Sequence, residues 1–346
     1  MRILLTVDPE IPVPPITYGG IERIVDALVR ELRRQGHHIG LAAHPASTTA
    51  CDAFFPWAKQ RSQNLSDTVH NARVLYRAAK SFDPDLIHSF SRLFYLLPVL
   101  STPVPKVMSF QREPAARTVR IASAIARNSL SFTGCSEYIC GQGRRGGGGE
   151  WAAIHNFVDT DYYDFQETVP IDAPLMFLSR IEADKGAHTA IAVAQRVGRK
   201  LLIAGNRLDV GPANEYWKHK IQPNLGRGIE YVGPVNDEQK NKLLGRAAAL
   251  IVPIEWNEPF GIVFAEALAC GTPIISCPRG ALPEIVRPGV EGFLVNSLDE
   301  ACAAVSKLKS IDRTACRKRA EEEFSVRVIA KKYLRLYEAR CSSSQL

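Results

Sequence analysis

Residues 250–276, LIVPIEWNEPFGIVFAEALACGTPIIS, carry the pattern that decides the fold. Residues 250–253 form a short apolar run that predicts a buried strand. Residues 261–269 are long enough and apolar enough for a buried helix, and residues 273–276 predict the next strand. A strand, a helix and a second strand in this order are typical of a parallel sheet that is covered by helices.

The same alternation extends over the whole chain. Further strands are predicted at residues 2–7, 39–43, 85–88, 105–110, 129–134, 175–179, 200–204 and 229–232. Helices are predicted from Gly20 to just before Gly36, at residues 69–81, 187–197 and 238–248, and within about 298–340. Residues 166–174, QETVPIDAP, are the best candidate for a linker. We therefore predict an α/β protein of two Rossmann-like, doubly wound domains that face a cleft.

A glycine-rich run interrupts this pattern. Residues 141–149 read GQGRRGGGG, which predicts a mobile segment. The run also matches the spacing GxGxxG of dinucleotide-binding loops. Such a loop must open a helix directly after a strand. The four consecutive glycines 146–149 cannot start a stable helix, so we interpret the match as accidental.

Composition and charge narrow the class of protein. The chain has 346 residues, of which 46% are hydrophobic and 23% charged, and its net charge is +7. This balance excludes disordered, collagen-like and coiled-coil chains. No apolar stretch approaches the roughly 20 residues of a membrane-spanning helix, and the first residues predict no secretory signal. The eight cysteines form no CxxC pair, which favours reduced thiols and a cytoplasmic location.

The net charge and the composition also bear on possible binding partners. The mild positive charge is not concentrated in a basic tail, so no nucleic-acid partner is predicted. Peripheral contact with a membrane is possible but not indicated, and the oligomeric state stays open.

Two glutamates carry the strongest chemical signal. Glu258 and Glu266 flank the start of the predicted helix 261–269. Gly261 lets a ligand approach the backbone amides there, where an anion is favoured. Glu258 would accept hydrogen bonds from hydroxyl groups. The helix is mostly apolar and therefore buried, and buried carboxylates need partners. We interpret the pair as ligand-binding residues rather than as two solvated surface glutamates.

The motif EPFGIVFAEALACGTPII resembles the Glu-x7-Glu motif of the retaining nucleotide-sugar glycosyltransferases of family four, which have the GT-B fold. Further stretches that match this family, in chain order, are Tyr18-Gly19-Gly20-Ile21-Glu22-Arg23, Ile154-His155-Asn156-Phe157-Val158-Asp159, Phe177-Leu178-Ser179-Arg180 through Lys185-Gly186, Leu202-Ile203-Ala204-Gly205, Val232-Gly233, Gly280-Ala281-Leu282-Pro283-Glu284 and residues 289–295. The resemblance covers nearly the whole chain and is most specific in the C-terminal half.

The resemblance implies a function for each part of the chain. Residues 1–168 would bind the acceptor, residues 169–325 would bind the nucleotide sugar, and residues 326–346 would form a helix that crosses back to the first domain. The implied catalytic residues are His88, Arg180, Lys185 and Glu258. The implied donor-binding residues are Gly19, Gly20, Arg180, Lys185, Gly205, Val232, Gly233, Glu258, Phe260, Gly261, Ile262 and Glu266. Arg92, Gln111, Arg112 and Glu113 are candidates for acceptor binding.

The implied chemistry is transfer of a sugar, with retention of configuration, from a nucleoside diphosphate sugar to an unidentified acceptor. A UDP- or GDP-sugar is the expected donor. Arg180 and Lys185 would stabilise the charge that develops on the diphosphate, so no metal and no further cofactor are expected. The pairs Asp159/Asp161 and Asp83/Asp85 resemble metal-binding DxD motifs, but we interpret them as turn and capping residues.

One departure from the family leaves alternatives open. Many relatives carry His-x-His where this chain has His88-Ser89-Phe90, so the second histidine is missing. His88 is therefore either an active-site residue or a histidine of the core. The same fold also serves sugar-nucleotide epimerases and phosphorylases, and a non-catalytic protein that binds nucleotide sugars is a further alternative.

Overall fold

The computed structural model describes residues 1–16, 19–61 and 64–343, so Tyr18 of the predicted glycine loop lies outside the described residues. The chain divides into two compact units. The first contains residues 1–157 and 326–346, and the second contains residues 158–325. The boundary predicted between residues 168 and 169 lies further along the chain than this division. No helix in the described residues is both long and apolar enough to cross a membrane.

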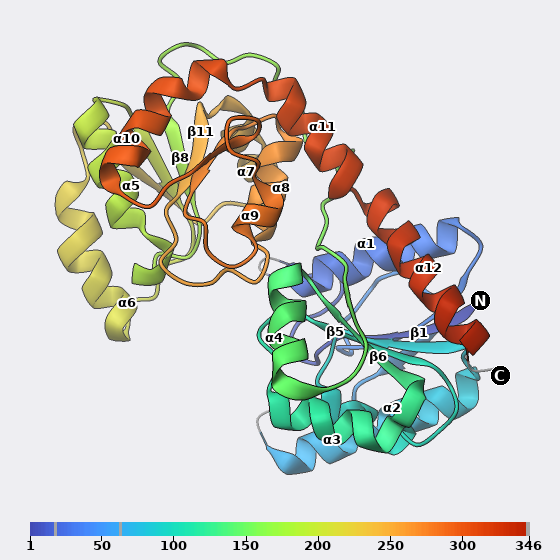
Figure 1. Cartoon of the computed structure of the whole chain (residues 1–346). Helices are drawn as coiled ribbons and strands as arrows, with labels where there is room; N and C mark the ends of the chain where they lie inside the picture. Colours follow the sequence, from blue (N-terminus) through green and yellow to red (C-terminus); the bar gives the residue numbers. More distant parts are fainter. Residues whose placement is uncertain (17–18, 62–63, 344–346) are drawn as a thin grey trace. The chain divides into compact units, whose positions relative to one another are not determined.

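The first unit is built on a parallel sheet in the order β3-β2-β1-β4-β5-β6-β7 (Figure 1). Its strands are β1 (Arg2–Thr6), β2 (His38–Ala43), β3 (Ala53–Pro56), β4 (Leu86–Ser89), β5 (Lys106–Phe110), β6 (Leu130–Gly134) and β7 (Trp151–Ala153). Its helices are α1 (Gly20–Arg34), α2 (Leu65–Phe82), α3 (Ala116–Ala126), α4 (Glu137–Gly147) and α12 (Val326–Ser343), with short 3-10 helices η1 (Leu93–Val99) and η2 (Arg127–Ser129). The strand order reverses between β1 and β4.

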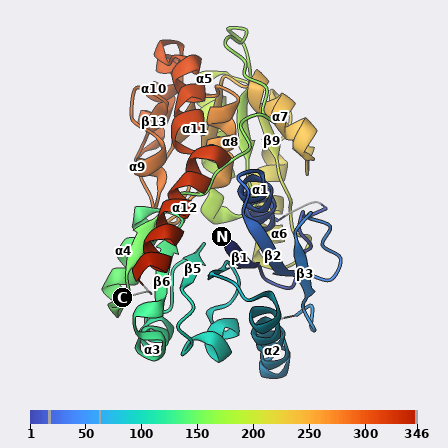
Figure 2. The same ribbon diagram turned by 90° about the vertical axis from the view of Figure 1, so that its right-hand side faces the viewer.

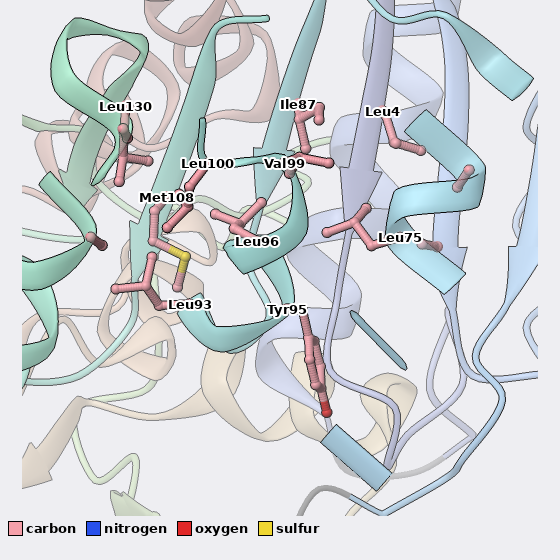
Figure 3. Packing of buried hydrophobic residues seen from close by; sticks show 14 of the residues in the cluster. Leu4, Leu75, Ile87, Leu93, Tyr95, Leu96, Val99, Leu100, Met108 and Leu130 are labelled. Carbon is pink, nitrogen blue, oxygen red and sulfur yellow. The ribbon is translucent and has the colours of Figure 1, made fainter. Parts of the chain in front are cut away.

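Apolar residues from the strands, α2 and η1 form the core on one face of this sheet. Figure 3 shows Leu4 and Ile87 on the strands, Leu75 on α2 and Tyr95 on η1 within one cluster of buried side chains. Burying these side chains is the main favourable contribution to the stability of such a layer. η1 was not predicted, because a seven-residue apolar run that contains Pro98 has no clear helical period.

The last helix, α12, belongs to the first unit and packs beside α1 (Figures 1 and 2). Its side chains Tyr333 and Tyr337 are buried. Tyr337 hydrogen-bonds to His88 on β4, and Tyr333 lies 3.4 Å from the hydroxyl of Ser109 on β5. Two residues at the C-terminal end of the chain therefore complete the core beneath β4 and β5.

The prediction for the glycine-rich run was wrong. Residues 137–147 form α4, which begins before the run, with Ser136 capping the amide of Ile139. Two of the glycines lie where the helix meets other parts of the unit. A Cβ atom on Gly143 would come within 2.3 Å of the Trp151 ring, and one on Gly146 within 2.8 Å of Ala116. Glycine is therefore needed for close packing, and the GxGxxG match lies inside a helix rather than at its start.

The second unit contains another parallel sheet, in the order β10-β9-β8-β11-β12-β13. Its strands are β8 (Leu175–Leu178), β9 (Leu201–Ala204), β10 (Ile229–Gly233), β11 (Ala249–Val252), β12 (Ile274–Ser276) and β13 (Gly292–Leu294). Its helices are α5 (Ala187–Val197), α6 (Gly211–Tyr216), α7 (Asp237–Arg246), α8 (Ile262–Ala269), α9 (Leu282–Ile285), α10 (Leu298–Lys307) and α11 (Arg313–Glu323). Short turns of helix are η3 (Ala183–Lys185), η4 (Trp217–Ile221), η5 (Gln222–Asn224) and η6 (Leu308–Ser310).

Local signals explain where several helices begin and end. α7 starts with a capping box, in which Asn236 and Gln239 satisfy each other's backbone amides. α5 ends at Gly198, whose φ of 65° closes the last turn. Each Asp pair contains a turn or capping residue, as predicted, whereas Asp85 accepts a hydrogen bond from the Arg2 amide. Asp83 is the C-cap of α2, and the Asp159 carboxylate accepts a hydrogen bond from the Asp161 amide.

Candidate functional site

The carboxyl ends of β8, β9, β10 and β11 bring most of the predicted donor-binding residues to one edge of the second sheet. Arg180 follows β8, Gly205 follows β9, Gly233 ends β10, and Glu258 follows β11. The strand order reverses between β8 and β11, so Arg180 and Glu258 lie on either side of the switch point. Open α/β sheets bind their ligands at this position.

At this edge, two glycines allow neighbouring segments to pack closely against the backbone. Gly205 has a φ of 142°, and a Cβ atom there would lie 1.7 Å from the carbonyl oxygen of Ser179. Gly261 is the N-cap of α8 with a φ of 80°, and a Cβ atom there would lie 2.6 Å from the Phe264 ring. A side chain at either position would push these segments apart. Gly261 therefore lets the chain turn into α8, and the start of a helix is a place where an anion is favoured.

Glu258 is held by two donors that bind the same carboxylate oxygen. The ammonium group of Lys185 and the indole N–H of Trp256 each lie 2.9 Å from Glu258 Oε2. The ammonium group also lies 4.1 Å from the centre of the Trp256 ring, a favourable cation–π distance. No described residue donates a hydrogen bond to the other oxygen, Oε1. Glu258 is therefore fixed in orientation and keeps one acceptor oxygen available.

Glu266, on α8, has the same arrangement. The phenol of Tyr163 donates to Glu266 Oε1 at 2.7 Å, and the ammonium group of Lys240 binds the same oxygen at 2.5 Å. Lys240 also pairs with Asp237 at 3.1 Å. Burial alone would lower the pKa of Lys240, but the charges of Glu266 and Asp237 outweigh it and raise that pKa above its usual value. Within the described residues, Glu266 Oε2 has no hydrogen-bond donor.

Burial and the neighbouring Glu266 charge both raise the pKa of the Tyr163 phenol. Tyr163 therefore stays protonated and acts as a donor to the glutamate over the whole physiological range. Glu266 is itself buried, with 8% of its surface exposed. Its Oε2 atom is not among the fully buried atoms that lack a partner, so it can accept a hydrogen bond from water or from a hydroxyl group of a ligand.

The remaining predicted donor-binding residues differ in how accessible they are. Arg180 pairs with Glu182 at 2.8 Å and keeps 47% of its side chain exposed, so it can turn toward a ligand. Val232, Gly233 and Ile262 are partly exposed. Phe260 is 1% exposed and packs against Phe324, so only its backbone can contact a ligand.

His88 lies inside the first unit and has no exposed surface. Its Nδ1 atom lies 2.5 Å from the Tyr337 hydroxyl, and its Nε2 atom lies 2.7 Å from the Ser109 hydroxyl. The ring of Phe90 packs at 4.3 Å, centre to centre. Burial lowers the pKa of His88 to about 3. With both ring nitrogens engaged, this geometry favours the alternative of a core histidine over the predicted catalytic role.

The predicted acceptor-binding residues lie at the carboxyl edge of the first sheet. Arg92 follows β4, and Gln111, Arg112 and Glu113 follow β5. Gln111 accepts a hydrogen bond of 2.7 Å from the Asn156 side chain, and Glu113 accepts one from the Tyr138 hydroxyl. Gly19 is the N-cap of α1 and Gly20 its first residue. These residues belong to the first unit, and their predicted roles stay predictions.

Asp8 is a residue at this edge that the sequence analysis missed. It follows β1, next to the point where the strand order reverses, and its carboxylate accepts a hydrogen bond of 3.0 Å from the Arg92 amide. Burial, together with the charge of Glu10, raises the pKa of Asp8 to about 6, although Arg92 and Arg112 act in the opposite direction. An acidic residue directly after the first strand was the signal that could have identified it.

Trp256, Tyr163 and Lys240 were also missed. Trp256 lies two positions before Glu258, so a tryptophan in a polar loop was a usable signal. Tyr163 and Lys240 gave none, because they are distant from Glu266 in sequence. In residues 1–16, 19–61 and 64–343, no three His, Cys, Asp or Glu side chains are placed to hold a metal ion.

Two parallel sheets, each with a reversal of strand order and polar residues at its carboxyl edge, define a nucleotide-binding α/β protein of two Rossmann-like units. Comparisons with known proteins name the family. A model described as "Glycosyltransferase Family 4" matches residues 18–162, and one described as "Glycosyl transferases group 1" matches residues 166–323. The chain belongs to glycosyltransferase family four. It is therefore a glycosyltransferase that uses nucleotide-sugar donors, as the sequence predicted.

Individual relatives agree with this assignment. The chain is 26% identical to a glycogen synthase of Mycobacterium tuberculosis, over 88% of this chain and 86% of that protein. AviGT4, a glycosyltransferase involved in avilamycin A biosynthesis, matches with a TM-score of 0.76 and 24% identity over 99% of this chain and 98% of that one. Anabaena HepE in complex with UDP-glucose matches with a TM-score of 0.72 and 18% identity over 98% and 100%. The structural matches confirm the predicted GT-B fold.

Proposed function

We propose that this protein transfers a sugar from a uridine or guanosine diphosphate sugar to a hydroxyl acceptor, with retention of configuration. The observation that carries the proposal is the pair of glutamates at the start of α8. Each is held through one oxygen, and the other oxygen has no donor among the residues that the structure describes. Hydroxyl groups of a sugar and of a ribose are donors of the right kind. The solved complex of HepE with UDP-glucose supports a donor of this class.

In this proposal, each residue of the second unit has one role. Glu258 accepts hydrogen bonds from hydroxyls of the donor sugar, and Glu266 from the ribose. Arg180 and Lys185 stabilise the negative charge that grows on the diphosphate as the bond to the sugar breaks. The amides at Gly261 and Ile262 bind the anion at the start of α8. The acceptor oxygen bonds to the anomeric carbon, and its proton passes to the leaving diphosphate.

A set of variants tests these roles by calorimetry. Glu266→Ala should weaken binding of UDP and of UDP-glucose by a similar factor. Glu258→Ala should weaken only the sugar-bearing ligand. A thermal-shift panel of nucleotide sugars selects the donor first, because a bound ligand raises stability by mass action. Unchanged affinity in both variants would remove these glutamates from the donor site.

Turnover of the selected donor tests the phosphate-binding residues. Arg180→Ala should lower kcat by about two to three orders of magnitude, the usual cost of losing one donor aimed at developing charge. Arg180→Lys should restore only part of this loss, because an ammonium group cannot make two parallel hydrogen bonds. If Arg180→Ala keeps kcat and KM within about threefold of the wild type, less than 1 kcal/mol is lost and the role is excluded. Isomerisation of the donor without transfer would contradict the proposed reaction.

A further inference from the structure

Glu258 and Glu266, the two glutamates of the proposed donor site, have hydrogen-bond partners of the same two kinds. Each carboxylate receives an ammonium group and an aromatic donor on a single oxygen. For Glu258 these are Lys185 and the Trp256 indole, and for Glu266 they are Lys240 and the Tyr163 phenol. In both cases the lysine also lies near the aromatic ring, at 4.1 Å from Trp256 and 5.8 Å from Tyr163.

This arrangement limits how each carboxylate can act. A carboxylate has two equivalent oxygens and rotates freely unless something distinguishes them. Two donors on one oxygen stop that rotation, and the second oxygen then points in one direction only. The lysine ammonium group also places a positive charge beside the oxygen that it binds. An acceptor that is already fixed in orientation loses less freedom when a hydroxyl group binds to it than a mobile acceptor does.

We propose that Trp256, Tyr163 and Lys240 are positioning residues that set donor affinity through these glutamates. Trp256 acts through Glu258 and therefore on the sugar. Tyr163 and Lys240 act through Glu266 and therefore on the ribose of the nucleotide. This inference rests on the proposed function, and it assigns the recognition of the two halves of the donor to two separate groups of residues.

Tyr163 has more than a packing role in this scheme. It comes from the segment between the two family-model matches, outside α7 and α8, and is 7% exposed. Its ring contacts Tyr162 edge-on, and its hydroxyl donates to Glu266. Tyr163→Phe removes that one hydroxyl and keeps the ring. The variant therefore separates the donor role from the packing role.

The experiment measures the dissociation constants of UDP, UDP-glucose and 2′,3′-dideoxy-UDP by calorimetry, with GDP and its analogues if the wild type selects GDP. Tyr163→Phe and Lys240→Met should each weaken UDP and UDP-glucose roughly tenfold, since each removes a hydrogen bond to a charged group. Their effect should vanish with the dideoxy nucleotide, which lacks both ribose hydroxyls. A purely structural defect would weaken all three ligands alike.

Trp256→Phe should behave differently. It keeps a ring beside Lys185 but removes the indole N–H, so UDP should bind as to the wild type and UDP-glucose roughly tenfold more weakly. Tyr162→Phe is the matched control for Tyr163, because its ring also stays in place and it does not bond to Glu266. It should leave all dissociation constants unchanged.

Three results would contradict the proposed function, this inference, or one part of it. If wild-type protein binds neither UDP, GDP nor their sugars, the proposed function fails and this inference fails with it. If the wild type binds but Tyr163→Phe and Lys240→Met do not change affinity, or lower it equally for the dideoxy nucleotide, the inference alone is overturned. If Trp256→Phe weakens UDP as much as UDP-glucose, the division between sugar and ribose is wrong.

Discussion

Single buried residues show how strongly the interior changes ordinary chemistry. In the unfolded chain, where it is exposed to solvent, His88 has a pKa near 6.5. In the fold its pKa is about 3, because burial disfavours its charged form. Below pH 6.5 His88 binds a proton in the unfolded chain but stays neutral in the folded protein. The free energy of unfolding must therefore fall as the pH drops from 6.5 toward 3.

Replacing His88 tests this linkage. His88→Gln should reduce the slope of stability against pH between 6 and 4 by about 1.4 kcal/mol per pH unit, the contribution of one proton. Urea denaturation at several pH values measures the difference between the two proteins. A difference that stays constant with pH would show that His88 titrates normally, and the buried placement would then be wrong.

For Asp8 the linked stability changes with pH in the opposite direction. Its pKa rises from 3.8 to about 6 in the fold, so folding favours the neutral acid. The stability linked to this group is fully present below pH 3.8 and is lost as the pH rises through 6. Asp8→Asn should therefore stabilise the protein at pH 8, by about 1–3 kcal/mol, and have little effect at pH 4.

Urea midpoints of wild type and Asp8→Asn at the two pH values give this comparison. The variant Asp85→Asn is a suitable control, because Asp85 lies at the other end of the same sheet and accepts a backbone hydrogen bond from Arg2 there. Asp8→Asn that is neutral or destabilising at pH 8 would contradict the proposed environment of Asp8.

At the scale of elements, α4 shows that a glycine-rich sequence can form a regular helix. The physical reason is that the helix packs closely on its neighbours. Gly143 is buried against Trp151, whereas Gly141 has no atom within 4 Å of the position that a Cβ would take. The two glycines therefore respond differently to the same substitution, although they are two residues apart.

Gly141→Ala should stabilise the protein by up to about 1 kcal/mol, because alanine loses less backbone entropy in a helix. Gly143→Ala should destabilise it by about 1–3 kcal/mol, because the new methyl group overlaps the Trp151 ring. Thermal denaturation of the two variants gives the signs directly. Equal stabilisation of both variants would mean that α4 does not contact Trp151 as described.

At the scale of the whole molecule, the proposed function predicts that Arg180 and Lys185 stabilise the leaving diphosphate without a metal ion. Arg180 and Lys185 lie at the carboxyl edge of the second sheet, whereas Asp83 caps α2 and Asp159 accepts a hydrogen bond from the Asp161 amide. We therefore expect turnover to be unchanged after exhaustive treatment with EDTA. Assays with and without added Mg²⁺ or Mn²⁺ provide the comparison, and complete loss that either ion restores would contradict the expectation.

The sequence by itself determined the class of fold, the positions of most strands and the glutamate motif, because these follow from local patterns. An apolar run with a helix after it predicts a buried strand wherever it occurs. Helices that begin or end at capping residues were predicted to within a few residues, as at α5 and α7. Short elements such as β3 and β7 were missed, since three or four residues carry too little periodicity.

Only the tertiary structure decided which residues meet. Tyr337 hydrogen-bonds to His88 although the two are 249 positions apart in the chain, and Tyr163 hydrogen-bonds to Glu266 although they are 103 positions apart. Arg313 donates to the backbone carbonyl of Gln166 and to those of Gly245 and Ala247 at the end of α7, which is a separate segment. Local propensity contains no information about such pairs, because they form only when the sheet order brings distant segments together. The burial of His88, and which oxygen of each glutamate lacks a donor among the described residues, follow from those distant contacts.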